Sequence, residues 1–231
     1  MRRIIAIVLI VAAVIPLQAQ RIRAYAAGGA ITSQVEGDEL KGFSHWGLTG
    51  GVGALMEFTD DGTWSGAIET DYACRGIYNN KYNSENYYNI KLDLHYVDIP
   101  VTIFYHDHYG GLRIGAGMVY SRLVAQPNGT IAYNPAYFVP DTSNMTFDKN
   151  DFAAAVELRF DLWRGLQFSA RYHYSILPVK KDWSFSLAGE TWTNNCYNSS
   201  VEIRLVWQFG SDDKQSRYKY SRNKPKRHRR R

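Results

Sequence analysis

The sequence lacks most features of a soluble enzyme or a helical membrane protein. It has only two cysteines among 231 residues, too few for a disulfide-stabilised scaffold. Its one long apolar run, residues 4–17, is shorter than the roughly 20 residues that a membrane-spanning helix needs. No nucleophile elbow or other catalytic motif is present, so the residues do not predict an enzyme.

The N-terminus has the layout of an export signal. Arg2 and Arg3 form a short basic head, the apolar run follows, and Ala19 supplies a small residue at a cleavage point. This pattern predicts a secretory signal peptide over residues 1–19, removed from the mature protein. The alternative is a membrane-anchoring helix, which the length of the run disfavours. Residues 20–210 then form one domain, and residues 211–231 a separate tail.

Eight stretches of the domain alternate apolar and polar residues, which is the signal of β-strands. They cover residues 22–33, 46–58, 64–75, 92–105, 112–121, 152–162, 166–176 and 201–209. The fourth stretch slips phase near Asp98-Ile99-Pro100. Because proline cannot donate a hydrogen bond to a strand ladder, we expect a β-bulge there. The chain is therefore predicted to be all-β.

The connections between these strands alternate in length. Residues 59–63, 107–110 and 163–165 are tight turns, whereas residues 34–45, 79–91, 127–151 and 178–195 are long and polar. Short turns on one rim and long loops on the other are typical of outer-membrane barrels, whose long loops lie outside the cell. The prediction is an eight-stranded antiparallel transmembrane up-and-down β-barrel with both chain ends in the periplasm.

A soluble lipocalin-like barrel would also alternate, so the character of each face matters. The polar face is rich in small residues and carries charges of both signs, while none of the strands from residue 46 onward contains a lysine. A packed lumen favours arginine, because its planar guanidinium group pairs with carboxylates. The polar face, which also carries Asp93, is thus predicted to form a lumen charge network of Glu57, Glu69, Asp71, Arg75, Arg113, Glu157, Arg159, Asp161, Arg171, Glu202 and Arg204.

The apolar face carries aromatic residues at both ends of the strands, as membrane-facing walls do at the two interfaces. Those near the periplasmic rim are Phe58, Trp64, Tyr109, Phe160, Trp163, Phe168, Trp207 and Phe209. Those near the outer rim are Trp46, Tyr72, Tyr96, Tyr120, Phe152 and Tyr174. Two aromatic girdles predict that the barrel sits in the outer membrane of a Gram-negative bacterium, with outer-membrane lipid against its wall.

The fourth strand carries a recognisable motif. Residues 96–105 read YVDIPVTIFY, residues 111–117 read GLRIGAG, and residues 163–172 read WRGLQFSARY. In these segments the chain resembles the PorT-like outer-membrane β-barrel family, with Asp98 in place of the usual glutamate. The resemblance implies the same barrel fold over residues 22–209. It also suggests an accessory role in an envelope secretion or assembly machine.

The remaining candidates for chemistry are weak. The lumen charges could line an ion path, but eight strands leave room only for side chains, so a structural network is favoured over a pore. His106 and His108 share one face of an extended segment but lack a third metal ligand, so a solvated turn is expected there. His95 and His173 have no motif to anchor a catalytic triad. Cys74 and Cys196 fall on the third and eighth strands, too far apart for a disulfide. No metal or cofactor is predicted.

The tail has a charge opposite to that of the body. Residues 211–231 contain ten Lys/Arg against two Asp, a balance of +8, whereas residues 21–210 contain 15 Lys/Arg against 20 Asp/Glu, a balance of −5. Its composition predicts a disordered periplasmic segment. The residues expected to interact are Lys224, Lys226, Arg227, Arg229, Arg230 and Arg231. Because the periplasm contains little nucleic acid, the expected partner is peptidoglycan or an acidic periplasmic protein.

These observations predict a non-enzymatic outer-membrane barrel that acts as a structural or interaction protein. Its long loops would meet the outside and its basic tail the periplasm, with other envelope proteins as further partners. The accessory role suggested by the PorT-like resemblance is the first alternative. A lipid-modifying outer-membrane enzyme is the second.

Deleting residues 211–231 should leave membrane insertion intact, because the last strand already ends on an aromatic residue, Phe209. It should also abolish salt-sensitive co-sedimentation with peptidoglycan or a periplasmic protein, since contacts of this kind are screened by salt. Heat-modifiable gel migration checks the insertion. Equal co-sedimentation of the truncated and full-length proteins would contradict the role of the tail.

Overall fold

The computed structural model describes residues 22–38, 42–82, 87–107, 110–133, 139–140, 146–187 and 189–210. The predicted signal peptide, the basic tail, His108 and Tyr109, a predicted member of the periplasmic girdle, lie outside these residues. The strands are β1 (Ile22–Glu36), β2 (His45–Glu57), β3 (Trp64–Tyr82), β4 (Tyr87–Asp107), β5 (Leu112–Tyr133), β6 (Val139–Pro140), β7 (Asn150–Trp163), β8 (Leu166–Ser175), β9 (Lys180–Leu187) and β10 (Glu190–Gln208). Within the described residues, no helix is long and apolar enough to cross a membrane.

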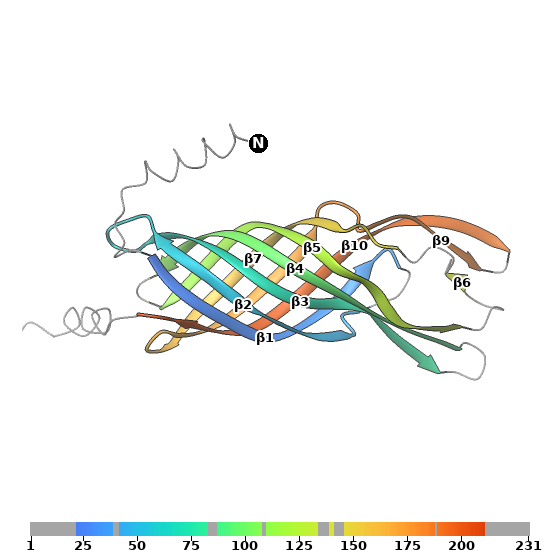
Figure 1. Ribbon diagram of the computed structural model, residues 1–231, viewed down its shortest axis with the longest axis horizontal. Coiled ribbons are helices and arrows are strands. Elements are labelled where there is room, and N and C mark those ends of the chain that lie inside the picture. Colours follow the sequence, from blue (N-terminus) through green and yellow to red (C-terminus); the bar gives the residue numbers. More distant parts are fainter. Residues whose placement is uncertain are drawn as a thin grey trace, which may run out of the picture.

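Eight of these strands close into an antiparallel barrel, which confirms the predicted fold class. The order is β1-β2-β3-β4-β5-β7-β8-β10, and β10 pairs with β1 to complete the circle (Figure 1). This closing ladder runs from the pair Tyr25–Gln208 to the pair Glu36–Tyr197. Closure pairs the backbone groups of every barrel strand with both neighbours, as a structure in contact with lipid requires.

The wall separates two environments, as the alternation predicts. In β10, Glu202 and Arg204 are 1% exposed, whereas their neighbours Ile203 and Leu205 are about half exposed. β7 repeats the pattern along most of its length. The polar face is therefore the inside of the barrel and the apolar face is the outside. This is the opposite of a lipocalin-like arrangement, in which the apolar face lines the cavity.

The two predicted aromatic girdles are present, with one error. Phe58, Trp64 and Trp163 are about half exposed near the short-turn rim, and Trp46 and Phe152 are exposed on the outer wall toward the other rim. Tyr96 is fully buried inside the barrel, so its assignment to the outer girdle was wrong. Toward the long-loop rim the inside of the barrel is apolar. The assignment of Tyr96 assumed that apolar side chains face outward, and that rule does not hold in this part of the barrel.

The predicted bulge near Asp98-Ile99-Pro100 is also wrong. β3 and β4 keep one register from the pair Ile68–Val101 to the pair Asp71–Asp98, and β4 pairs with β5 through Pro100–Val119 without a shift. The slips in register lie higher, between Asp93 and Tyr96. The apparent change of phase in the sequence comes from Leu92, Leu94 and Tyr96, which are apolar but face inward.

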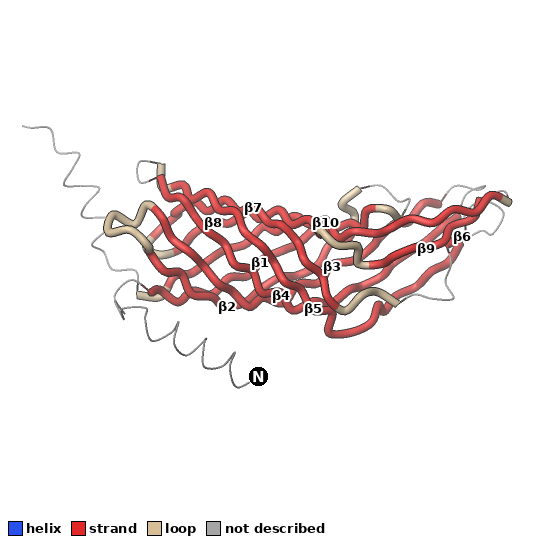
Figure 2. Tube along the Cα trace, turned by 90° about the horizontal axis from the view of Figure 1, so that it is seen from above, coloured by secondary structure: helices blue, strands red, loops and turns tan. Residues whose placement is uncertain are grey.

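The long connections predicted over residues 79–91 and 178–195 consist largely of strand. β3, β4 and β5 have 19, 21 and 22 residues, and β10 has 19, about twice the 9–11 that span the membrane. β9 pairs with β10, and β6 pairs with β9, beyond the barrel (Figures 1 and 2). Lys81, Lys91 and Lys180 lie in these projecting parts rather than in loops. We use the name extension for the parts of β3, β4, β5 and β10 that project past the long-loop rim, together with β6 and β9.

The opposite rim is made of tight turns, and the first and last strands also begin and end there. β7 and β8 are joined by Arg164 and Gly165, which both have positive φ (35° and 88°), as a two-residue hairpin turn requires. Short turns of outer-membrane barrels typically face the periplasm, so we expect the extension to face the outside of the cell.

Candidate functional site: the lumen charge network

Charged side chains gather inside the barrel at mid-height. They come from five strands, so that residues distant in sequence meet across the lumen. β3 supplies Glu69, Asp71 and Arg75; β4 supplies Asp98; β7 supplies Glu157 and Arg159; β8 supplies Arg171; and β10 supplies Glu202 and Arg204. Four arginines therefore face five carboxylates in a space that bulk water does not fill.

Glu157 is one centre of this network. Its carboxylate accepts hydrogen bonds from Arg159 Nε at 2.6 Å, Arg171 Nη2 at 2.7 Å and Arg204 Nη2 at 3.0 Å. Arg171 Nε donates a further bond at 3.0 Å, and the hydroxyl of Ser169 donates one at 2.6 Å. The side chain is fully buried. Charge-assisted bonds from three directions hold this carboxylate ionised and fixed.

Glu69 is the second centre, on the opposite wall. It accepts bonds from Arg159 Nη2 at 2.6 Å, Arg171 Nη2 at 2.9 Å and Arg204 Nη1 at 3.0 Å. The hydroxyl of Tyr25 adds another at 2.7 Å. Because the same three arginines contact Glu157, they join β3, β7, β8 and β10 across the barrel.

A branch of the network extends toward the long-loop rim through Arg75. This side chain forms an ion pair with Asp98, lies 3.8 Å from Glu202, and stacks over the ring of Tyr96 at 5.3 Å. Its Nη2 is 3.4 Å from Nδ1 of His173, which places that histidine inside the polar interior. Tyr96 and Asp98, both from the PorT-like motif, thus have structural contacts in the lumen.

Glycines on the inner face make room for these large side chains. A Cβ atom at Gly53 would lie 2.6 Å from the ring of Tyr25 and 2.7 Å from Cγ of Glu69. One at Gly51 would lie 2.2 Å from a carboxylate oxygen of Asp71. At Gly51 and Gly53, β2 therefore places no side chain in the lumen beside the network. This space allows a narrow lumen to hold the large charged side chains.

Apolar side chains close both ends of the network. Below it, Tyr25, Leu55, Ala67, Phe104 and Val206 form a buried cluster toward the short-turn rim. Above it, the upper cluster contains Val35, Ile77, Ile90, Leu92, Leu94, Tyr96, Leu123, Phe147, Val179, Trp183, Phe185 and Cys196. A charged layer between two apolar layers favours a structural core over an ion path.

Three of the predicted network residues lie apart from the rest. Glu57 pairs with Arg23 at 3.2 Å near the short-turn rim, and Asp161 lies 3.7 Å from Nε2 of His106. Arg113 is buried on β5 and forms no ion pair with another residue of the described ranges. His106 is also buried, so the solvated turn expected for it was wrong. The other predicted members are brought together, apart from Asp93.

Asp93 is on the outside of the barrel, so its assignment to the inner, polar face was wrong. Its Oδ1 lies 2.8 Å from Nε2 of His45, the first residue of β2, where the alternation predicts a loop. Nδ1 of His45 is 3.2 Å from the hydroxyl of Ser33. We call Ser33, His45, Cys74 and Asp93 the outer-rim cluster; no periodicity in the sequence brings these four together.

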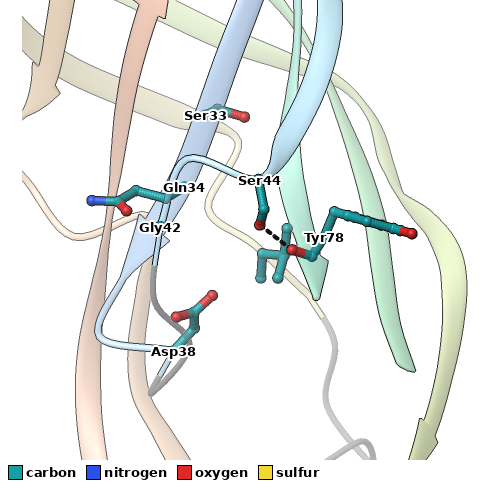
Figure 3. Close-up of a pocket in the computed structure, with 7 residues that line it drawn as sticks. Ser33, Gln34, Asp38, Gly42, Ser44 and Tyr78 are labelled. Carbon is teal, nitrogen blue, oxygen red and sulfur yellow. Dashed lines mark hydrogen bonds between the residues drawn. The ribbon is translucent and has the colours of Figure 1, made fainter. Parts of the chain in front are cut away.

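The order Ser33, His45, Asp93 resembles that of a catalytic triad, but the serine cannot act as a nucleophile. Ser33 is 1% exposed, and its oxygen already accepts a hydrogen bond from the backbone N–H of Gly76 at 2.9 Å. The neighbouring shallow hollow is lined by Ser33, Gln34, Asp38, Gly42, Ser44, Ile77 and Tyr78 (Figure 3). The hydroxyl of Ser44 donates to the carbonyl of Tyr78 across it.

A closed barrel with an apolar outside and a charged, packed inside defines an outer-membrane β-barrel protein. The model of the outer membrane protein beta-barrel domain family matches residues 4–209, and the chain belongs to this family. It therefore resides in the outer membrane of a Gram-negative bacterium. No curated protein matches the chain.

Solved structures similar to this chain are also outer-membrane proteins. Ail, the attachment invasion locus protein of Yersinia pestis, is 13% identical, with a TM-score of 0.42 over 82% of this chain and 99% of that chain. Neisserial surface protein A is 13% identical, with a TM-score of 0.42 over 80% and 97%. OprG from Pseudomonas aeruginosa is 12% identical, with a TM-score of 0.36 over 81% and 94%. Similarities this low say nothing about activity.

Replacing Glu157 with Gln should destabilise the barrel strongly. Three buried guanidinium groups would lose their shared carboxylate, and breaking a buried ion pair costs about 3–5 kcal/mol. Unfolding by urea from detergent micelles measures the change. Glu57→Gln is the matched control, expected to cost about 1 kcal/mol or less because its pair with Arg23 is partly exposed. Equal losses for both variants would contradict the central role of Glu157.

The purified protein should show no sustained conductance in planar lipid bilayers, because the charged layer is packed and lies between apolar clusters. Arg171→Ala is the informative variant, since Arg171 contacts Glu69, Asp71 and Glu157. Reproducible wild-type channels that disappear in this variant would show that the network is an ion path.

Proposed function

We propose that the protein is a non-enzymatic interaction barrel, in which a closed, cross-linked transmembrane wall holds the extension outside the cell. The observation that carries this proposal is the contrast between the two halves of the molecule. The membrane half is filled by its ionic network. The strand length in excess of the membrane span is all at the other end, where it forms further paired sheet (Figure 2).

The extension is a packed structure with an interior of its own. Phe147, Trp183 and Phe185 form part of the upper cluster, and Trp192 packs against it. Lys180 is 7% exposed, with its Nζ 5.6 Å from the ring centres of both Phe147 and Trp183. A surface that is already ordered loses little conformational entropy when a partner binds.

The outward side of the extension is suited to a polar partner. Lys181, Thr191 and Asn195 are exposed around the β9–β10 hairpin, and Tyr78 is 40% exposed on β3. Mixed polar and aromatic surfaces combine contact area with adaptable hydrogen bonds. This favours a second envelope protein or surface polymer as the partner of the extension.

The basic tail supplies a second contact in the same proposal. Its ten Lys/Arg suit peptidoglycan or an acidic periplasmic protein, and it follows directly from β10 at the short-turn rim. The barrel would then connect material on the two sides of the outer membrane.

The PorT-like resemblance supports a second candidate, an accessory role in a secretion or assembly machine. The contacts of Tyr96 and Asp98 favour a structural meaning for the shared motif, because both residues stabilise the lumen. A secretion component as the cross-linked partner of the extension would favour this candidate over the broader one.

Replacing residues 182–194 with an Asn-Gly turn should abolish cross-linked complexes formed on intact cells, because it removes most of the β9–β10 hairpin. Barrel insertion should be unaffected, since the β10–β8 ladder begins at Ser199. The measurement is cross-linking of an epitope-tagged protein, followed by mass spectrometry of the adducts. Asp60→Asn, in the exposed turn between β2 and β3 at the opposite rim, leaves the hairpin in place and is the control. Identical adducts from the trimmed and wild-type proteins would refute the proposal.

A further inference from the structure

Three side chains of types that can bind metal ions, an imidazole, a thiol and a carboxylate, lie close together on the outside of the barrel. His45 begins β2, Cys74 lies on β3 and Asp93 lies on β4. One nitrogen, one sulfur and one oxygen from them lie within 4.8 Å of one another. We propose that these three residues of the outer-rim cluster bind a zinc ion, with a fourth position open to water.

The spacing needs little adjustment. Zinc bonds of about 2.0–2.3 Å in tetrahedral geometry place neighbouring ligand atoms roughly 3.4 Å apart. His45 Nε2 and Asp93 Oδ1 are 2.8 Å apart, so an ion that replaces the shared proton moves them by well under 1 Å. The thiol of Cys74 approaches from the neighbouring strand within the same 4.8 Å.

The strands are arranged to bring His45 to this position. β2 stays paired with β1 as far as the pair Ser33–His45, but its pairing with β3 ends at Thr49–Ala73. Above that point the imidazole reaches over β3 toward β4. Gly76 lies beneath it, and a Cβ atom there would be 2.9 Å from His45 Nε2. A larger residue at position 76 would push the ring away.

A second hydrogen bond sets the protonation state that zinc requires. When Nε2 binds a metal, Nδ1 carries the proton and donates to the hydroxyl of Ser33, 3.2 Å away. Ser33 is held in turn by the backbone N–H of Gly76, at 2.9 Å. Metal-binding histidines usually have such a partner on the other ring nitrogen, and losing it lowers metal affinity by about 10–100-fold.

Charge and exposure favour zinc at this place. A thiolate and a carboxylate together carry two negative charges, so a divalent ion leaves the site neutral, and mixed N, S and O ligands suit zinc. His45 is 3% exposed, but the Asp93 side chain is 32% exposed and Cys74 is half-buried. An ion can therefore enter from the solvent. Tyr72, two residues below Cys74 on the same face, marks the membrane interface.

Cobalt provides a direct test, because a thiolate bound to Co²⁺ gives a charge-transfer band in the near ultraviolet. The full chain in detergent micelles, reduced and stripped of metal, should bind one equivalent of Co²⁺ with this band, and Zn²⁺ should displace it. Cys74→Ser should remove the band, while His45→Asn and Asp93→Asn should lower the affinity at least tenfold. Ser33→Ala should lower it about tenfold through the histidine.

Two variants keep the test specific. Cys196→Ser removes the other thiol, which is buried in the upper cluster, and should leave the band unchanged. His95→Asn removes the histidine opposite Cys74, which is bonded to Tyr72 instead, and should leave the affinity within about twofold. Heat-modifiable migration confirms that each variant is folded. A wild-type protein without the band, or a band that persists in Cys74→Ser, would overturn the proposal.

Discussion

Charged groups enclosed in the middle of a narrow barrel can be stable only if they neutralise one another, and the rest of this structure is adapted to that requirement. Arg159, Arg171 and Arg204 each reach both Glu69 and Glu157, so that opposite walls share the same guanidinium groups. Removing any one member exposes its partners to an apolar surrounding in which an isolated charge is costly. The glycines of β2 provide the space that the network needs. The apolar layers above and below it keep water away from the charges.

The alternation of apolar and polar residues was sufficient to predict the strands that cross the membrane, because lipid on one side and a packed polar core on the other enforce a period of two. It failed above the membrane. There both sides of the sheet change environment, and Leu92, Leu94 and Tyr96 face inward although they are apolar. The same change led to the wrong placement of Asp93 and to a predicted bulge near Asp98 and Pro100, where the register is continuous.

The charge network was predictable for a chemical reason, namely the use of arginine without lysine on the inner face. Asp98 was missed as a member because proline and the apparent phase change obscured its direction. The outer-rim cluster could not be predicted at all. It depends on where β2 stops pairing with β3, and on a glycine that lets a histidine cross a strand. Neither property is visible in the periodicity of one chain.

The extension is unevenly distributed around the barrel. β3, β4 and β5 continue past the rim on one side and β10 with β9 on the other, whereas β1 ends at Glu36, β7 begins at Asn150 and β8 ends at Ser175. The described strands therefore project past this rim without rotational symmetry about the barrel axis. Turning the protein in the plane of the membrane changes which of these strands face a neighbouring molecule. A partner that approached from the side of β3, β4 and β5 would thus meet a different surface from one that approached from the side of β10 and β9.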